Sequence, residues 1–275
     1  MAKKIAVIAI HGMGDTDRDY AKPLKENLES ILDPAEWEEI HFDDIWYQDI
    51  LQSNQEKLFQ RSKSQLDGKF LRKFLLYGIS DAAGLEYSRT MPGGVYDISQ
   101  RRIFDVMGEA YQALEQKPSP VVMVAQSLGG QVISNYIWDA NKKPKPVKWG
   151  VWRHAHADLS EKEKKFRRFG SLRTLFTTGC NIPIFIGGLP PDQIKPIKPP
   201  NAKFAWKNYF DEDDVLGWPL QPLNLRGGYA TLVEDVAINA GGFFTSWNPL
   251  SHIGYWTDMD FLRPLTAHLR ELLNE

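Results

Sequence analysis

Two short apolar runs, each ending in a glycine-containing turn, constrain the fold of this chain most. The first lies within 4–10 and leads into the turn 11–14, and the second, Val121–Ala125, leads into the turn 126–130. A continuous apolar run with many β-branched residues is typical of a strand that is buried on both faces. Such strands belong to parallel sheets covered by helices, so the two runs predict an α/β fold.

Predicted strands and helices alternate along the rest of the chain. Further strands are predicted at Ile40–Tyr47, Leu172–Phe176 and Phe204–Phe210. Apolar residues at helical spacing predict helices at Tyr20–Ile31, Leu51–Tyr87, Ser99–Leu114, Leu128–Ala140 and Met259–Leu273. Because the 275 residues contain no repeat and no obvious linker, we expect a single domain, 1–275, with insertions at about 48–94 and 141–171.

Charge is distributed unevenly along the chain. The net charge is −2, but the segment 141–173 carries eleven Lys and Arg residues against three acidic ones, which leaves −10 for the remainder. The near-neutral total argues against a dedicated nucleic-acid-binding protein. We expect the basic segment 141–173 to be a solvated charged loop, and peripheral contact with anionic membrane lipids is the alternative.

The apolar runs are too short for targeting or membrane spans. The N-terminal run Ile5–Ile10 has six residues, whereas a signal peptide needs roughly 7–15 and a membrane helix about 18. We therefore expect a cytoplasmic protein. A single cysteine, Cys180, excludes an internal disulfide and is expected to be a buried packing residue rather than a nucleophile.

Ser127 is the sharpest chemical signal in the sequence. It follows the strand Val121–Ala125 directly, a helix begins directly after it, and the small residues Ala125 and Gly129 flank it at −2 and +2. This pattern is that of a nucleophile elbow, in which a tight turn presents the serine hydroxyl at the end of a strand. The alternative is that Ser127 merely caps the following helix.

The turn after the first strand is a candidate oxyanion site. Its glycines allow the backbone to approach a substrate oxygen, and the N–H groups of Met13 and Leu128 are the predicted donors. His11, Gly12 and Gln126 are predicted to line the substrate pocket. For His11 alone, a structural role in a strand-to-helix turn is the competing interpretation.

A serine nucleophile needs a base and a carboxylate that orients it. His252 precedes the last helix, in a predicted loop, and follows the acidic cluster 211–214 in the chain order expected for this topology. Asp214 is the predicted acid and Asp213 the alternative, although the cluster also fits a solvated turn. His154 and His156 have no further ligands nearby, so we predict no metal and no cofactor, and His268 fits a surface or packing position.

These residues together resemble an α/β-hydrolase of the lipase/esterase type. The resemblance spans nearly the whole chain, from the turn 11–14 through Ser127 to His252. The stretch 208–223 is also similar to the acid loop of DDHD-type intracellular phospholipases, in which the residue aligned with Asp214 belongs to the triad. Two departures stand out: Ala125 replaces the usual glycine, and the first two strands of the family are missing. The resemblance therefore implies a mostly parallel sheet of about six strands flanked by helices.

The resemblance implies a serine hydrolase that cleaves carboxylic esters through Ser127, His252 and Asp214. The insertion 48–94 lies where such folds often carry a lid, and extra packing over the sheet edge is the equal alternative. Phospholipase, thioesterase and acyltransferase activity use the same triad, and a non-catalytic binding protein is the competing class. The expected partner is a small-molecule or lipid ester.

Overall fold

A computed structural model of the chain describes residues 2–14, 16–50, 52–142, 148–224, 228–240 and 251–275. Its centre is one six-stranded sheet in the order β2-β1-β3-β4-β5-β6, in which every neighbouring pair is parallel. The strands are β1 (Ile5–Ile10), β2 (Ile40–Ile45), β3 (Val121–Gln126), β4 (Leu172–Thr178), β5 (Ala205–Asp211) and β6 (Val233–Ile238). Five of them were predicted from apolar patterning, and their observed bounds lie close to the predicted ones.

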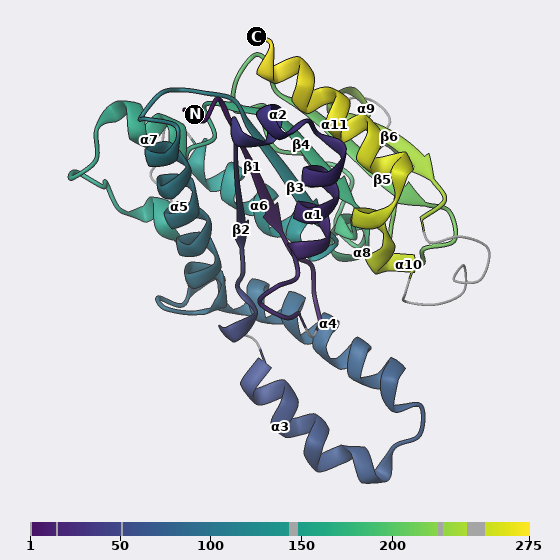
Figure 1. Cartoon of the computed structure of the whole chain (residues 1–275). Helices are drawn as coiled ribbons and strands as arrows, with labels where there is room; N and C mark the ends of the chain where they lie inside the picture. The colour runs from purple at the N-terminus through teal and green to yellow at the C-terminus, as the bar shows by residue number, and fades with distance from the viewer. Residues whose placement is uncertain (1, 15, 51, 143–147, 225–227, 241–250) are drawn as a thin grey trace.

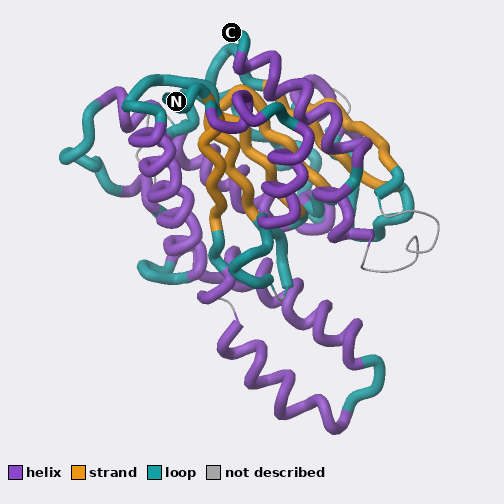
Figure 2. Tube along the Cα trace, in the orientation of Figure 1, coloured by secondary structure: helices purple, strands orange, loops and turns teal. Residues whose placement is uncertain are grey.

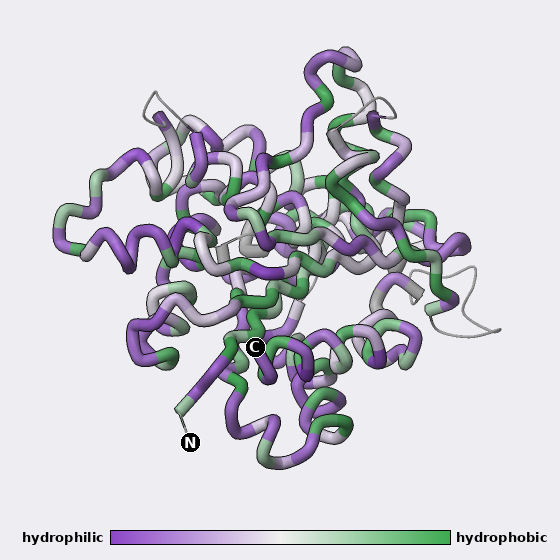
Figure 3. Tube along the Cα trace, turned by 90° about the horizontal axis from the view of Figure 1, so that it is seen from above, coloured by the Kyte–Doolittle hydropathy of each residue, from purple (hydrophilic) through white to green (hydrophobic). Residues whose placement is uncertain are grey.

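Helices cover both faces of the sheet (Figures 1 and 2). On one face, α1 (Lys22–Ile31) and α11 (Met259–Leu273) pack on alternate strand residues; on the other lie α5 (Val95–Ala113) and α6 (Leu128–Ala140). Hydrophobic segments accordingly run through the middle of the molecule (Figure 3). The remaining short helices are α2 (Pro34–Glu38), α7 (Glu161–Arg167), α8 (Ile182–Ile186), α9 (Tyr229–Leu232) and α10 (Ser251–Gly254). Burial on both faces explains why the central strands are apolar at every position.

The insertion predicted at 48–94 is helical and begins three residues after β2 ends. It consists mainly of α3 (Gln52–Ser62) and α4 (Lys69–Tyr87), which extend beyond the carboxyl end of the sheet (Figure 1). Instead of one helix over 51–87, a turn separates the two, and Gly68 adopts a left-handed conformation there with a φ of 62°. The next helix, α5, begins at Val95 rather than at the predicted Ser99, so the break at 91–94 is shorter than expected.

The sixth strand, β6, was not predicted from the sequence. It lies at the edge of the sheet, and most of its residues are partly exposed. Glu234 and Asp235 interrupt the apolar run that identifies the central strands. The basic segment also folds further than a loop: beyond 143–147, which lie outside the described residues, it contains α7 and the start of β4. Within the described residues, no helix has both the length and the apolar character that crossing a membrane requires.

Six parallel strands in this order, with a serine turn between the third strand and its helix, form an α/β-hydrolase fold. In open parallel sheets, functional groups gather outside the carboxyl ends of the strands. The loops that follow β1, β3, β4 and β5 meet at that end, and they carry the candidate residues described next.

Candidate active site

Ser127 occupies a strained turn between β3 and α6. Its backbone has φ 52° and ψ −123°, a conformation that costs a non-glycine residue on the order of 1–3 kcal/mol. The Ser127 N–H donates to Thr178 O at 2.9 Å, so the neighbouring strand β4 holds the turn in place. Strain held by surrounding hydrogen bonds is the expected signature of a nucleophile elbow.

Two glycines let the loop after β1 approach this turn. A Cβ atom on Gly12 would lie 2.5 Å from the Cβ of Ser127, and one on Gly129 would lie 2.6 Å from His11 O. Both distances are far below van der Waals contact. Any larger residue at either position would therefore separate the β1 loop from the serine.

Asn181 donates a hydrogen bond to the serine hydroxyl and was not identified from the sequence. Its Nδ2 lies 3.2 Å from Ser127 Oγ. The side chain is fully buried, and its Oδ1 has no hydrogen-bond partner in the described part of the chain. Asn181 lies three residues beyond β4, next to β3 in the sheet. The one sequence signal was a polar residue just past a central strand, which by itself does not indicate contact with Ser127.

His252 and Asp214 form a buried pair. His252 Nδ1 lies 2.8 Å from Asp214 Oδ2, which also accepts from Tyr255 Oη at 2.9 Å, while Oδ1 accepts from the Leu216 N–H at 3.0 Å. Burial by itself would raise the pKa of Asp214, but the hydrogen bond and charge interaction with His252 and the other donors outweigh it and lower the pKa. An ionised Asp214 fixes the proton of His252 on Nδ1 and leaves the Nε2 lone pair available as a base.

The structure places Asp214, and not Asp213, beside His252. Asp213 is exposed, and its backbone N–H donates to Asp211 Oδ1 at 2.8 Å as part of the turn. One expectation was wrong: His252 does not lie in a loop but on the four-residue helix α10. Residues 241–250, which belong to the predicted loop, lie outside the described part of the structure.

Ser127 and His252 line one cavity of about 550 Å³, together with the predicted pocket residues His11, Gly12 and Gln126. His252 Nε2 has no hydrogen-bond partner among the described residues, so its hydrogen bond to Ser127 is not formed. Gln126 Nε2 donates to His252 O at 2.7 Å and ties the base to the elbow. Catalytic hydrogen bonds are often long without substrate and tighten when it binds.

The two predicted oxyanion donors belong to the start of α6 and to the β1 loop. Leu128 is the first residue of α6, where backbone N–H groups have no partner within the helix and the helix dipole is positive. Met13 follows Gly12 on the β1 loop and lines the cavity, whereas Leu128 is buried and is not among the residues that line it.

A buried carboxylate in the insertion holds the β1 loop. Asp81, on α4, accepts from the Gly14 N–H at 3.0 Å with Oδ2 and from Gln55 Nε2, on α3, with Oδ1. Burial raises the pKa of Asp81 to about 6, and the donors Gly14 and Gln55 offset part of that effect. Since Gly14 follows Met13 directly, the helical insertion positions the β1 loop beside Ser127. It also contributes Lys73 and Tyr77 to the cavity.

The hydrogen bonds of His11 are those of a structural residue. Its Nε2 accepts from the Tyr47 N–H at 3.0 Å, which leaves Nδ1 as the donor to Gly12 O at 2.7 Å. The ring is buried and stacks on Tyr47 with centroids 4.0 Å apart. Burial lowers the pKa of His11 to about 3. The structural interpretation of His11 therefore fits, although the residue also borders the cavity.

The other singled-out residues lie outside this site. Cys180 is fully buried, as predicted, and burial raises the pKa of its thiol to about 12. His156 stacks on Phe104, and its Nε2 contacts Val151 O at 2.9 Å. His268 Nε2 lies 2.8 Å from Thr174 Oγ1, a packing position on α11.

Known structures resemble this chain only distantly. Esterase PE8 is 13% identical, with a TM-score of 0.46 over 98% of this chain and 94% of that one. A structure from the metagenome-derived lipolytic enzymes LipS and LipT is 10% identical, with a TM-score of 0.43 over 98% of this chain and 95% of that one. No protein-family model and no curated protein sequence matches the chain.

Proposed function

We propose that this protein is a serine hydrolase that cleaves carboxylic esters, with Ser127 as nucleophile, His252 as general base and Asp214 as the orienting acid. One observation carries the proposal: a strained elbow serine shares a cavity with a histidine whose Nδ1 is bound to a buried carboxylate. A helix cap alone does not require that strain or that pair. A non-catalytic binding protein likewise has no need of them.

In the proposed reaction, His252 Nε2 takes the proton of Ser127 Oγ while Oγ bonds to the ester carbonyl carbon. The bond from that carbon to the alcohol oxygen then breaks, and His252 returns the proton to the leaving alcohol. Water attacks the acyl-enzyme by the same route and releases the acid and free Ser127. Asp214 keeps the proton on Nδ1 and stabilises the imidazolium that forms in each half-reaction.

We assign stabilisation of the tetrahedral oxyanion to the N–H groups of Met13 and Leu128. Asn181 Nδ2 donates to the nucleophile Ser127 Oγ itself, so it orients the hydroxyl rather than the oxyanion, and this hydrogen bond leaves the Ser127 O–H free to donate to His252. One preorganised donor typically contributes about 10²–10³ in turnover. Tyr20, Tyr77 and Trp256 line the cavity and give it aromatic walls, which suit an apolar acyl or alcohol group.

The proposal is tested with p-nitrophenyl esters of increasing acyl length, followed by a thioester and a phospholipid. We expect hydrolysis of at least one carboxylic ester, and a loss of roughly 10³-fold or more in Ser127→Ala. Thioester or phospholipid cleavage without p-nitrophenyl ester cleavage would assign the same triad to one of the alternative substrates. If no substrate is turned over above the Ser127→Ala background, the protein is not an acyl hydrolase of this kind.

A further inference from the structure

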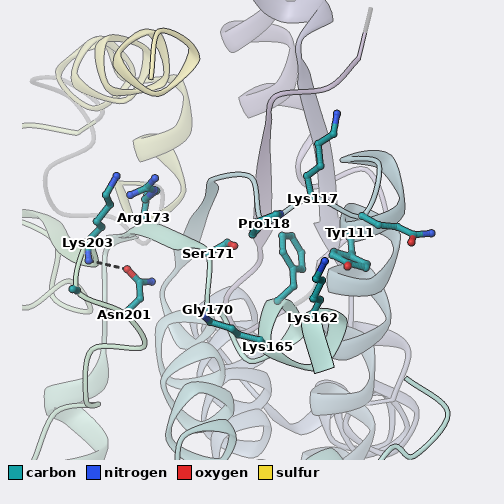
Figure 4. Close-up of a pocket in the computed structure, with 13 residues that line it drawn as sticks. Tyr111, Lys117, Pro118, Lys162, Lys165, Gly170, Ser171, Arg173, Asn201 and Lys203 are labelled. Carbon is teal, nitrogen blue, oxygen red and sulfur yellow. Dashed lines mark hydrogen bonds between the residues drawn. The ribbon is translucent and has the colours of Figure 1, made fainter. Parts of the chain in front are cut away.

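A second cavity lies at the opposite end of the sheet from Ser127. Its lining residues come from just before β3 (Lys117), just before β4 (Gly170) and just before β5 (Lys203), and from the helices α5 and α7. Since all strands are parallel, these segments meet at the amino end of the sheet. The cavity is an open groove of about 580 Å³ (Figure 4), and the proposed ester chemistry does not involve it.

Five cationic side chains line this groove: Lys117, Lys162, Lys165, Arg173 and Lys203. Arg173 and Lys203 lie on one side in Figure 4, and Lys117 and Lys162 lie on the other. The cations thus come from separate parts of the chain and face one space. Like charges held around one groove repel each other, so an anion bound between them is stabilised by several cations at once.

Nearby carboxylates neutralise only part of this charge. Glu115 pairs with Lys117 at 2.6 Å, and Glu275 lies 3.0 Å from Arg173 and 3.6 Å from Lys203. The pairs of Lys117 and Lys203 are exposed, and exposed ion pairs are weak and readily exchanged, whereas the Arg173 side chain is only 18% exposed. No ion pair involving the other two lysines is found in the described part of the chain. The groove therefore keeps an excess of positive charge.

The groove has an apolar floor and a fixed wall. Tyr111 and Phe166 are buried beneath it, and Pro118 adds a further apolar surface. On the wall, Asn201 donates to Leu172 O at 2.7 Å and accepts from the Lys203 N–H at 2.8 Å, which ties the Lys203 segment to β4. Cations on two sides of an apolar surface suit an organic molecule that carries more than one anionic group.

We propose that this groove binds a soluble organic ligand that carries two or more phosphate groups. Phosphate groups match the lysine and arginine side chains chemically, and separated phosphates are needed to reach both sides at once. Its position argues against a membrane as the source of the phosphate. A membrane docked on the amino end of the sheet would lie opposite the cavity of Ser127, so it would not present a lipid to the serine.

Calorimetric titration with inorganic tripolyphosphate at low ionic strength tests the proposal. We expect saturable binding that weakens with added salt, and a rise in Kd of roughly tenfold or more in Lys162→Gln/Lys165→Gln. The matched control is Lys22→Gln/Lys25→Gln on α1, which removes the same charge away from the groove and should leave Kd unchanged. Equal weakening in both double variants, or no binding by the wild type, would overturn the site.

Two further binding measurements define the ligand. Inorganic orthophosphate should bind much more weakly than tripolyphosphate, since it cannot contact both sides; equal affinity would overturn the requirement for two phosphates. Vesicles of phosphatidylglycerol test the membrane source. Vesicle binding that is lost in Lys162→Gln/Lys165→Gln, without tripolyphosphate binding, would overturn the soluble ligand. None of these readouts depends on ester hydrolysis.

Discussion

At the carboxyl end of the sheet, Ser127, His252 and Asp214 are each no more than 5% exposed, whereas Lys162 and Lys165 at the amino end are exposed to solvent. The first group is held by short hydrogen bonds to buried partners. The second has few partners and is held mainly by the backbone that carries it. One parallel sheet thus supports two kinds of site, because its loops gather at both ends.

The difference predicts how each end responds to change. Buried, hydrogen-bonded groups interact strongly in a low-dielectric environment, so the loss of one partner has a large effect that salt barely alters. Exposed cations act through long-range attraction that salt screens, so each contributes little and the effects accumulate. The following experiments test this contrast.

The largest effect is expected for Asp214, the acid of the proposed triad. Asp214→Asn should reduce kcat for ester hydrolysis by roughly 10³–10⁴-fold, because an amide no longer fixes the proton of His252 on Nδ1. Asp213→Asn is the matched control on the neighbouring exposed residue and should retain wild-type activity. Equal losses in the two variants would show that the turn itself, and not the Asp214–His252 pair, supports activity.

Asn181→Ala should have the next largest effect. We expect kcat to fall by roughly 10²-fold with little change in KM, since the lost hydrogen bond positions the Ser127 hydroxyl rather than the bound substrate. Thermal unfolding of the variant separates this effect from damage to the fold. A change confined to KM, or normal kcat, would show that Asn181 does not position the proposed nucleophile.

Asp81 predicts an unusual dependence of stability on pH. Its pKa is about 6 in the folded protein against an ordinary 3.8, so the folded state binds a proton more readily than the unfolded state. This group therefore destabilises the fold above pH 6, and the penalty disappears as the pH falls from 6 towards 4, by up to about 3 kcal/mol.

Denaturant unfolding of the wild type and Asp81→Asn across pH 4–8 measures that dependence. The free energy of unfolding of the wild type, relative to the variant, should rise as the pH falls through about 6. The other titrating groups contribute equally to the pH dependence of both proteins, so their contributions cancel in this difference. A difference that is flat with pH would mean that Asp81 has no raised pKa and does not hold Gly14 as a buried carboxylate.

The smallest effect is expected from the groove. Lys162→Gln/Lys165→Gln should leave kcat and KM for a neutral p-nitrophenyl ester unchanged, because the two sites lie at opposite ends of the sheet. Lys22→Gln/Lys25→Gln again serves as the charge-matched control. A clear loss of ester hydrolysis in the groove variant alone would contradict the separation of the two ends.

Local sequence patterns sufficed for the residues that define the fold and the proposed triad. Apolar strands followed by small-residue turns identified Ser127 and the β1 loop, and chain order pointed to His252. These signals are local because strand burial and elbow geometry act within about ten residues. The choice between Asp213 and Asp214 remained open because it depends on the turn after β5.

Contacts between distant segments were not predictable in this way. Asn181 approaches Ser127 only because β4 pairs with β3, and Asp81 reaches Gly14 only because α4 folds back onto the β1 loop. The groove at the amino end of the sheet also depends on contacts between distant segments. The basic segment 141–173 was visible in the sequence, but Lys117 and Lys203 join it only when the strands align in parallel.

Labelling with a fluorophosphonate probe, followed by peptide mass spectrometry, tests the central claim most directly. The reagent modifies a serine only where a base and an oxyanion site activate it, whatever the natural substrate is. We predict modification of the wild type at Ser127, none in Ser127→Ala, and much slower modification in His252→Ala. An unmodified wild type, under conditions that label a control esterase, or modification at another residue, would contradict the account.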